Sequence, residues 1–141
     1  MSIQAVLLPL FVQVTLTFVL LVWMAGVNRS AVLRREVKWQ EIALREPNWP
    51  ARNLQIRNAF LNQLEMPLLF YVLTILAWMT RHADLLFVIL AWIYVTLRIV
   101  HAYIHVTDNY VPRRGAVFLM SGIVLALMWL IFMLRILIAL G

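Results

Sequence analysis

The sequence predicts an all-α integral membrane protein built as a bundle of four transmembrane helices. Hydrophobic residues make up 65% of its 141 positions and charged residues 13%, and the mean hydropathy is +0.90. This is too apolar for a water-soluble domain of the same length. Four apolar runs, at residues 3–27, 59–80, 83–106 and 115–140, are each long enough to cross a bilayer, which takes about 20 helical residues. Apart from residues 28–58 the connections are short, so a single domain over residues 1–141 is expected.

The first run is expected to remain in the protein as a helix. The N-terminal residues MSIQAVLLPLF lack the basic segment and the small-residue cleavage site of a secretory signal. The connection at residues 28–58 is the long one, and Trp39 and Trp49 in it are typical of anchors at the level of lipid headgroups.

Basic residues predict the orientation of the bundle. Most of the net charge of +6 lies in the first connection and its flanks, which hold Arg29, Arg34, Arg35, Lys38, Arg45, Arg52 and Arg57. The third connection adds Arg113 and Arg114, whereas the second has only Arg81. The positive-inside rule therefore places the first and third connections in the cytoplasm and both termini on the opposite side. The basic loop is also expected to contact anionic membrane lipids, and no motif points to nucleic acid.

The second run carries polar residues along one stripe. At intervals of 3, 4 and 3 these are Gln55, Asn58, Asn62 and Glu65. Pro67 follows, and it is expected to kink the helix and to free a carbonyl beside the stripe.

The third run repeats the pattern in the opposite direction across the bilayer. The same intervals connect Arg98, His101, His105 and Asp108. Facing stripes in antiparallel helices would pair Glu65 with Arg98, Asn62 with His101, Asn58 with His105 and Gln55 with Asp108. A lone charge near the bilayer centre costs about 2.5–3.5 kcal/mol, so an ion pair between Glu65 and Arg98 is expected.

These stripes have either a structural or a functional interpretation. Polar pairs can serve only to hold helices together. Alternatively, the stripes form a site that opens to the cytoplasm between Asn58, His105 and Arg114. His101 and His105 are one helical turn apart, but without clear further ligands they are expected to form hydrogen bonds, and no metal is expected.

Two helix starts carry their own signals. Asp84 precedes the third run and is expected to act as its N-cap. Pro112 precedes Arg113 and Arg114 at the start of the fourth run, where backbone N–H groups and the helix dipole favour an anion. The chain has no cysteine, so any thiol must come from a ligand.

The segment NQLEMPLLFY resembles the second-helix motif of the MAPEG superfamily, the membrane-associated proteins of eicosanoid and glutathione metabolism. The series Arg98, His101, His105 and Arg114 resembles the third-helix residues and the catalytic arginine of its prostaglandin E synthase branch. The resemblance implies a homotrimer with glutathione bound between subunits. Asn58, Asn62, Glu65, Arg98, His101 and His105 would then form the glutathione site, and Arg114 would stabilise the thiolate.

The sequence departs from the family pattern at several of these positions. His105 and Phe118 stand where tyrosines are usual, Met66 replaces an aromatic residue, and Asn58 stands where an arginine is common. These departures resemble bacterial members more than the eicosanoid enzymes, which implies a bacterial inner membrane.

Two classes of function follow from the sequence. In the first, the protein is a glutathione-dependent transferase or peroxidase that takes lipophilic electrophiles from the bilayer. In the second, it is a non-enzymatic binding or small-molecule transport protein in which a buried Glu65 exchanges protons or cations.

Overall fold

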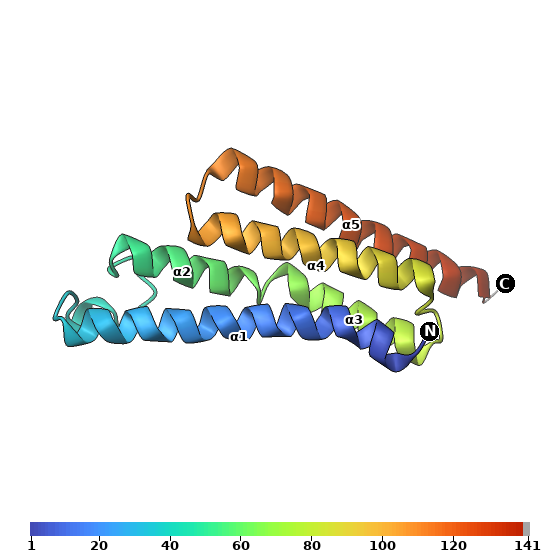
Figure 1. Cartoon of the computed structure of the whole chain (residues 1–141), viewed down its shortest axis with the longest axis horizontal. Helices are drawn as coiled ribbons and strands as arrows, with labels where there is room; N and C mark the ends of the chain where they lie inside the picture. The colour runs from blue at the N-terminus through green and yellow to red at the C-terminus, as the bar shows by residue number, and fades with distance from the viewer. Residues whose placement is uncertain (140–141) are drawn as a thin grey trace.

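The structure, a computed structural model that describes residues 1–139, consists of long helices that run side by side (Figure 1). The α-helices are α1 (Ile3–Leu33), α2 (Ala51–Asn62), α3 (Met66–Met79), α4 (Leu85–Val106) and α5 (Val111–Ala139), and one short 3₁₀ helix, η1, covers Trp39–Glu41. Because α2 and α3 follow each other as one broken span, residues 1–139 contain four spans of sufficient length and apolarity to cross a membrane. The predicted fourth run ends at Leu140, which lies outside the described residues.

Helix α1 is longer than the sequence predicts. Its N-terminus is capped by Ser2, whose hydroxyl accepts a 3.2 Å hydrogen bond from the Ala5 amide. Its 31 residues correspond to about 46 Å at the usual helical rise, whereas the apolar core of a bilayer is about 30 Å thick. The expected loop at residues 28–58 is therefore shorter, because α1 continues to Leu33 and α2 begins at Ala51.

The second span is interrupted between Asn62 and Met66. Tight turns fill the gap, with the Leu64 amide donating to the Leu61 carbonyl at 3.0 Å and the Glu65 amide to the Asn62 carbonyl at 3.4 Å. Pro67 lies in the first turn of α3, a position that suits a residue without an amide proton. The expected kink at Pro67 is thus a complete break, which is visible between α2 and α3 in Figure 1.

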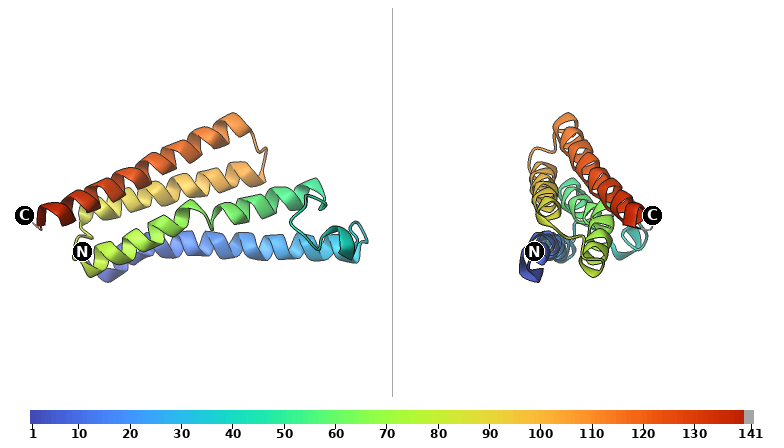
Figure 2. Two further views of the ribbon diagram at one scale, coloured as in Figure 1. Left: turned by 180° about the vertical axis from the view of Figure 1, so that it is seen from behind. Right: turned by 90° about the vertical axis from the view of Figure 1, so that its right-hand side faces the viewer.

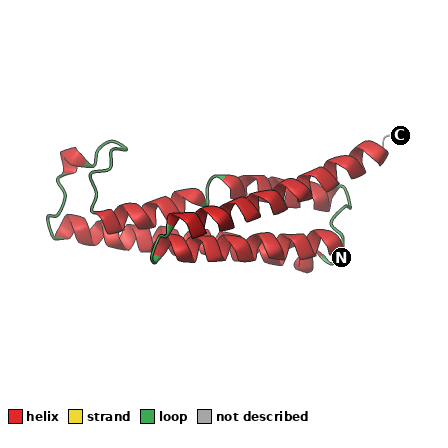
Figure 3. Ribbon diagram, turned by 90° about the horizontal axis from the view of Figure 1, so that it is seen from above, coloured by secondary structure: helices red, strands yellow, loops and turns green. Residues whose placement is uncertain are grey.

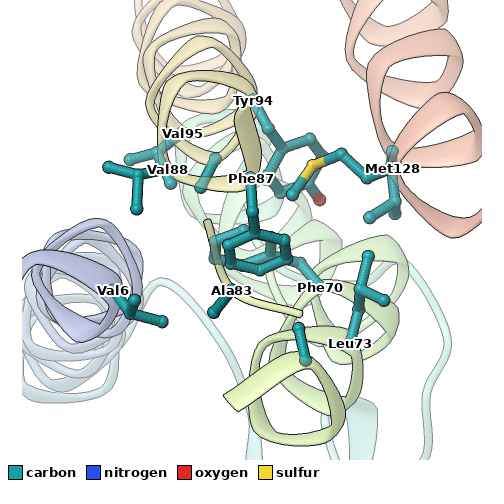
Figure 4. Close-up of a cluster of buried hydrophobic side chains, with 12 residues drawn as sticks. Val6, Phe70, Leu73, Ala83, Phe87, Val88, Tyr94, Val95 and Met128 are labelled. Carbon is teal, nitrogen blue, oxygen red and sulfur yellow. The ribbon is translucent and has the colours of Figure 1, made fainter. Parts of the chain in front are cut away.

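Helix α4 is the most buried of the spans and packs against α1, α2 and α5. The view along the bundle in Figure 2 shows α4 between α1 and α5. Between the break and the end of the bundle that carries the N-terminus, side chains from α1, α3, α4 and α5 form the main apolar core (Figure 4). Phe70 and Tyr94 lie at its centre, both fully buried, with their rings 4.9 Å apart.

The two ends of the bundle differ. The start of α1 and the end of α5 lie at the same end (Figure 1), as an even number of spans requires. The connection between α1 and α2 extends beyond the opposite end, together with η1 (Figure 3). The turn between α4 and α5 lies at that second end as well (Figure 1).

The turn between α3 and α4 is fastened to α5. Asp84 caps α4 as predicted, since its carboxylate accepts a 3.0 Å hydrogen bond from the Phe87 amide. The same carboxylate forms a 2.8 Å ion pair with Arg135 of α5. Partial burial acts to raise the pKa of Asp84, but the hydrogen bonds from Arg135 and the Phe87 amide outweigh it, so the pKa is lowered.

Candidate functional site

A cluster of basic and aromatic side chains lies where α4 faces the end of α2 and the start of α5. Arg98, His101 and His105 all project from one face of α4, because they are three and four residues apart. They are 0%, 2% and 6% exposed, respectively. Basic side chains this deep within an apolar bundle require partners or a ligand.

The guanidinium of Arg98 has one polar partner and one aromatic neighbour. Its Nη2 donates a hydrogen bond to Oδ1 of Asn62, the last residue of α2. Its Cζ lies 5.9 Å from the centre of the Phe118 ring of α5, within the range of a cation–π contact. The other two nitrogens, Nε and Nη1, are buried and have no hydrogen-bond partner in residues 1–139.

The two histidines pack edge to face. Their ring centres are 5.6 Å apart with an interplanar angle of 83°, and the His101 ring also lies 5.7 Å from Phe118. Nδ1 of each ring is buried, and neither atom has a hydrogen-bond partner in the described part of the chain. The cluster therefore presents several polar atoms that could bind a ligand.

The two arginines at the start of α5 have different surroundings. Arg113 forms a 3.2 Å ion pair with Asp108 and lies over the Tyr110 ring at 5.5 Å, so it is engaged at the surface of the turn. Arg114 is partly buried, donates to the Asn109 side chain, and lies within electrostatic range of His101 and His105. Arg114 therefore borders the cluster, and Arg113 does not.

The predicted pairing of the two polar stripes is wrong. Asn62 meets Arg98, three residues from the predicted partner His101, and Gln55 donates to the carbonyls of His105 and Thr107 at 2.8 and 2.9 Å. The prediction fixed the register by placing Glu65 opposite Arg98, but the break after Asn62 removes Glu65 from the helical stripe, and Asn62, the last residue of α2, lies opposite Arg98 instead. Glu65 falls in the break, at the N-cap position of α3.

Glu65 and Asn58 are the candidate residues that lie outside the cluster. Both side chains are exposed, and among residues 1–139 Glu65 forms no ion pair. The predicted ion pair between Glu65 and Arg98 is thus absent, although Glu65 remains within electrostatic range of the guanidinium. The structure brings Asn62, Arg98, His101 and His105 together, with Arg114 at their border.

A hydrogen bond between two buried glutamine side chains connects α1 to the break, and the sequence analysis did not predict it. Gln13 of α1 donates a 2.8 Å hydrogen bond to Gln63, and Gln63 donates a 3.0 Å bond to the Ala59 carbonyl. Both glutamines are fully buried. The signal was available, because a glutamine in the middle of an apolar run must find an internal partner.

Tyr94 was also missed. It lies one turn before Arg98 on the same face of α4, and its hydroxyl is buried without a hydrogen-bond partner in the described residues. Tyr94 precedes Arg98 by four residues and so continues the helical spacing of Arg98, His101 and His105. This spacing alone was a sufficient signal to count Tyr94 among the residues of that face.

Residues 1–139 contain no group of three or more His, Asp or Glu side chains that could hold a metal ion. The unsatisfied polar atoms of the cluster are nitrogens of Arg98, His101 and His105, and guanidinium nitrogens are donors that suit a ligand with carboxylate or carbonyl oxygens.

Comparison with known proteins gives one match. The model of a family described as the MAPEG family matches residues 6–134, which is most of the chain. No curated protein and no solved structure matches.

Proposed function

The chain belongs to the MAPEG family, whose members are generally membrane proteins of glutathione and eicosanoid metabolism, and on that premise we propose a glutathione-dependent membrane enzyme. It acts as a transferase or peroxidase on lipophilic electrophiles. The four apolar spans and the family make the chain an integral, multi-pass membrane protein, so both the enzyme and such substrates share the bilayer.

The observation that carries this proposal is the set of unsatisfied nitrogens at the basic cluster. Arg98 has two free donors, and the His101 and His105 rings each have one free nitrogen in residues 1–139. Glutathione has two carboxylates, peptide carbonyls and a thiol, all of which can accept hydrogen bonds. Buried donors without partners are costly, so a ligand that satisfies them gains affinity.

We assign the residues to different parts of the ligand. Arg98 and His101 donate to a carboxylate or peptide carbonyl, and Asn62, which already orients Arg98, adds an amide. The exposed Glu65 and Asn58 bind the ammonium and the outer polar groups from the side of the break. His105 stands where a tyrosine is usual in the family, and its ring nitrogen takes the place of the tyrosine hydroxyl in binding the ligand.

Arg114 is the residue proposed to act on the thiol. It lies in the first turn of α5, where the positive end of the helix dipole adds to its own charge. Such surroundings lower the pKa of a thiol from its ordinary value near 8.5. Glutathione supplies a thiolate sulfur that forms a bond to an electrophilic carbon as the leaving group departs, while the thiol proton passes to solvent.

Phe118 gives the site an apolar wall on the lipid side. Its ring packs against His101 and under Arg98, yet 37% of its surface remains exposed on the outside of the bundle. A lipophilic electrophile could therefore approach from the bilayer along α5. Phe118 lacks the hydroxyl of the usual tyrosine, so in this chain the stabilisation of the thiolate depends on Arg114.

Orientation and assembly complete the proposal. We propose that the end with the basic α1–α2 connection faces the cytoplasm of a bacterial inner membrane, with both termini on the other side. Exposed apolar side chains cover α1, α3 and α5. Part of this surface would be buried in a homotrimer, and the remainder would contact lipid.

Calorimetry of the protein in nanodiscs tests the proposal. Glutathione titrated in two buffers of different ionisation enthalpy should bind and release close to one proton, because the bound thiol becomes a thiolate. S-methylglutathione, which has no ionisable thiol, should bind without releasing the proton. Absence of binding by both peptides would refute the glutathione site, and binding without proton release would refute the role of Arg114.

A further inference from the structure

The connection between α1 and α2 encloses a groove that is separate from the basic cluster. Two adjoining hollows of about 450 and 290 Å³ share Asn28, Ile42 and Trp49 as lining residues. We call these two hollows the loop groove. None of Asn62, Arg98, His101, His105 and Arg114 lines either hollow.

The loop groove combines apolar walls with a cationic rim. Trp39, Ile42 and Trp49 of the connection all line the smaller hollow and form its apolar wall together with Val32 and Leu33 of α1. Three arginines line the hollows: Arg29, Arg45 and Arg57. None of them forms an ion pair within the residues that the structure describes.

No nearby carboxylate forms an ion pair with this rim in residues 1–139. Glu41 accepts a 3.3 Å hydrogen bond from the backbone amide of Lys38, and Glu46 accepts one of 3.3 Å from the Asn48 side chain. The three guanidinium groups are therefore not held by carboxylates within the described residues, and guanidinium groups are well suited to bind a phosphate.

The groove is expected to lie at the depth of lipid headgroups. The last turns of α1, which include Asn28 and Arg29, extend beyond the length that an apolar bilayer core of about 30 Å requires. Below the groove, Asn53 of α2 donates a 3.0 Å hydrogen bond to Asn28 of α1, which fixes the two helices that form its base. Trp39 is 72% exposed, as expected for a side chain that meets the interface of the membrane.

We propose that the loop groove binds an anionic phospholipid, with the phosphate among Arg29, Arg45 and Arg57 and the start of an acyl chain against Trp49 and Ile42. A basic segment beside a membrane span attracts anionic lipids in general. Here the hollow, the tryptophans and the unpaired arginines at one place define a particular site. A lipid held there would brace the α1–α2 connection against the bundle.

A comparison of two double variants with equal loss of charge tests the site. Arg45→Gln/Arg57→Gln removes two rim arginines, whereas Arg34→Gln/Arg35→Gln removes two exposed arginines of the same connection that line neither hollow. The full-length protein in neutral detergent is heated with added phosphatidylglycerol or phosphatidylcholine. Native mass spectrometry of the same samples counts the lipids retained by each folded variant.

Phosphatidylglycerol should raise the melting temperature of the wild type and of the Arg34/Arg35 variant, and phosphatidylcholine should not. The Arg45/Arg57 variant should lose most of this shift and retain several-fold less phosphatidylglycerol. Equal losses in the two variants would overturn the proposal, because a diffuse surface charge would then explain the effect. An equal shift from water-soluble glycerol phosphate or from glutathione would also overturn it, since the ligand would not be a lipid.

Discussion

Arg98 of α4 is tied to Asn62, the last residue before the break between α2 and α3, and not to Glu65. This contact joins the only fully buried arginine among residues 1–139 to the place where the second span loses its helical hydrogen bonds. The break and the basic cluster are therefore one structural unit, and changes in one are expected to affect the other.

Loss of the Asn62 side chain should destabilise the protein. Asn62→Leu leaves a further donor of Arg98 buried without a partner, which costs about 1–3 kcal/mol of unfolding free energy. Glu65→Ala is the contrasting variant, because Glu65 is exposed and unpaired in the described residues, and it should cost less than about 1 kcal/mol. Unfolding by titration with a denaturing detergent measures both. A larger loss of stability for Glu65→Ala than for Asn62→Leu would instead support the ion pair between Glu65 and Arg98 that the sequence predicted.

The buried glutamines should show energetic coupling. Gln13→Leu leaves the side-chain oxygen of Gln63 buried without its partner, and Gln63→Leu does the same to the side-chain nitrogen of Gln13. Each variant should lose about 1–3 kcal/mol of unfolding free energy. The double variant should lose less than the sum of the two single variants, by about 0.5–1.5 kcal/mol. Strict additivity in a double-mutant cycle would show that the hydrogen bond between α1 and the break contributes nothing.

The Asp84–Arg135 pair predicts a loss of stability in acid. The pKa of folded Asp84 is lowered from 3.8, so its contribution is present above pH 3.8 and is lost as the pH falls through the lowered value. Asp84→Asn keeps an N-cap acceptor but removes the charge. The wild type should be more stable than this variant by about 0.2–1 kcal/mol at neutral pH, with the difference vanishing in strong acid. A difference that persisted at pH 2 would mean that the ion pair is not its cause.

Cysteine labelling tests the orientation. The protein has no native cysteine, so a single cysteine can be placed at His82, in the turn between α3 and α4, or at Ala51, at the start of α2. An impermeant maleimide applied to intact cells should label the cysteine at position 82 and not the one at 51. The opposite pattern would place the basic cluster near the outer surface of the membrane.

The apolar spans and the Asp84 cap were predictable because they depend on local composition and on one side chain. The pairing of α2 with α4 was not. Its prediction extended a helical period across residues 63–65, where the chain leaves the helix, so Glu65 was placed on the wrong surface. The grouping of Arg98, His101 and His105 survived, because all three lie on the uninterrupted α4.

Gln13 shows why tertiary partners are harder to predict. Its polarity within an apolar run required a partner, but the sequence could not show that Gln63, fifty positions later, would provide it. That contact depends on the packing of α1 against the break. The loop groove is similar, because Trp39, Trp49 and the arginines that share it come from a connection without helical or strand periodicity.

Arg114 is proposed to stabilise a thiolate in this membrane bundle, and glutathione conjugation to a lipophilic chloronitrobenzene tests that role most directly. The wild type, Arg114→Ala and Arg113→Ala are compared in nanodiscs, with the ultraviolet absorbance of the bound thiolate recorded on the same samples. Arg114→Ala should lower kcat about 10²-fold or more and abolish the thiolate signal, with a smaller change in KM, because its charge acts on the developing anion. Arg113→Ala should retain nearly full activity, since Arg113 is engaged by Asp108 and Tyr110. Equal losses in the two variants, or a wild type without glutathione-dependent turnover and without a thiolate signal, would contradict the account.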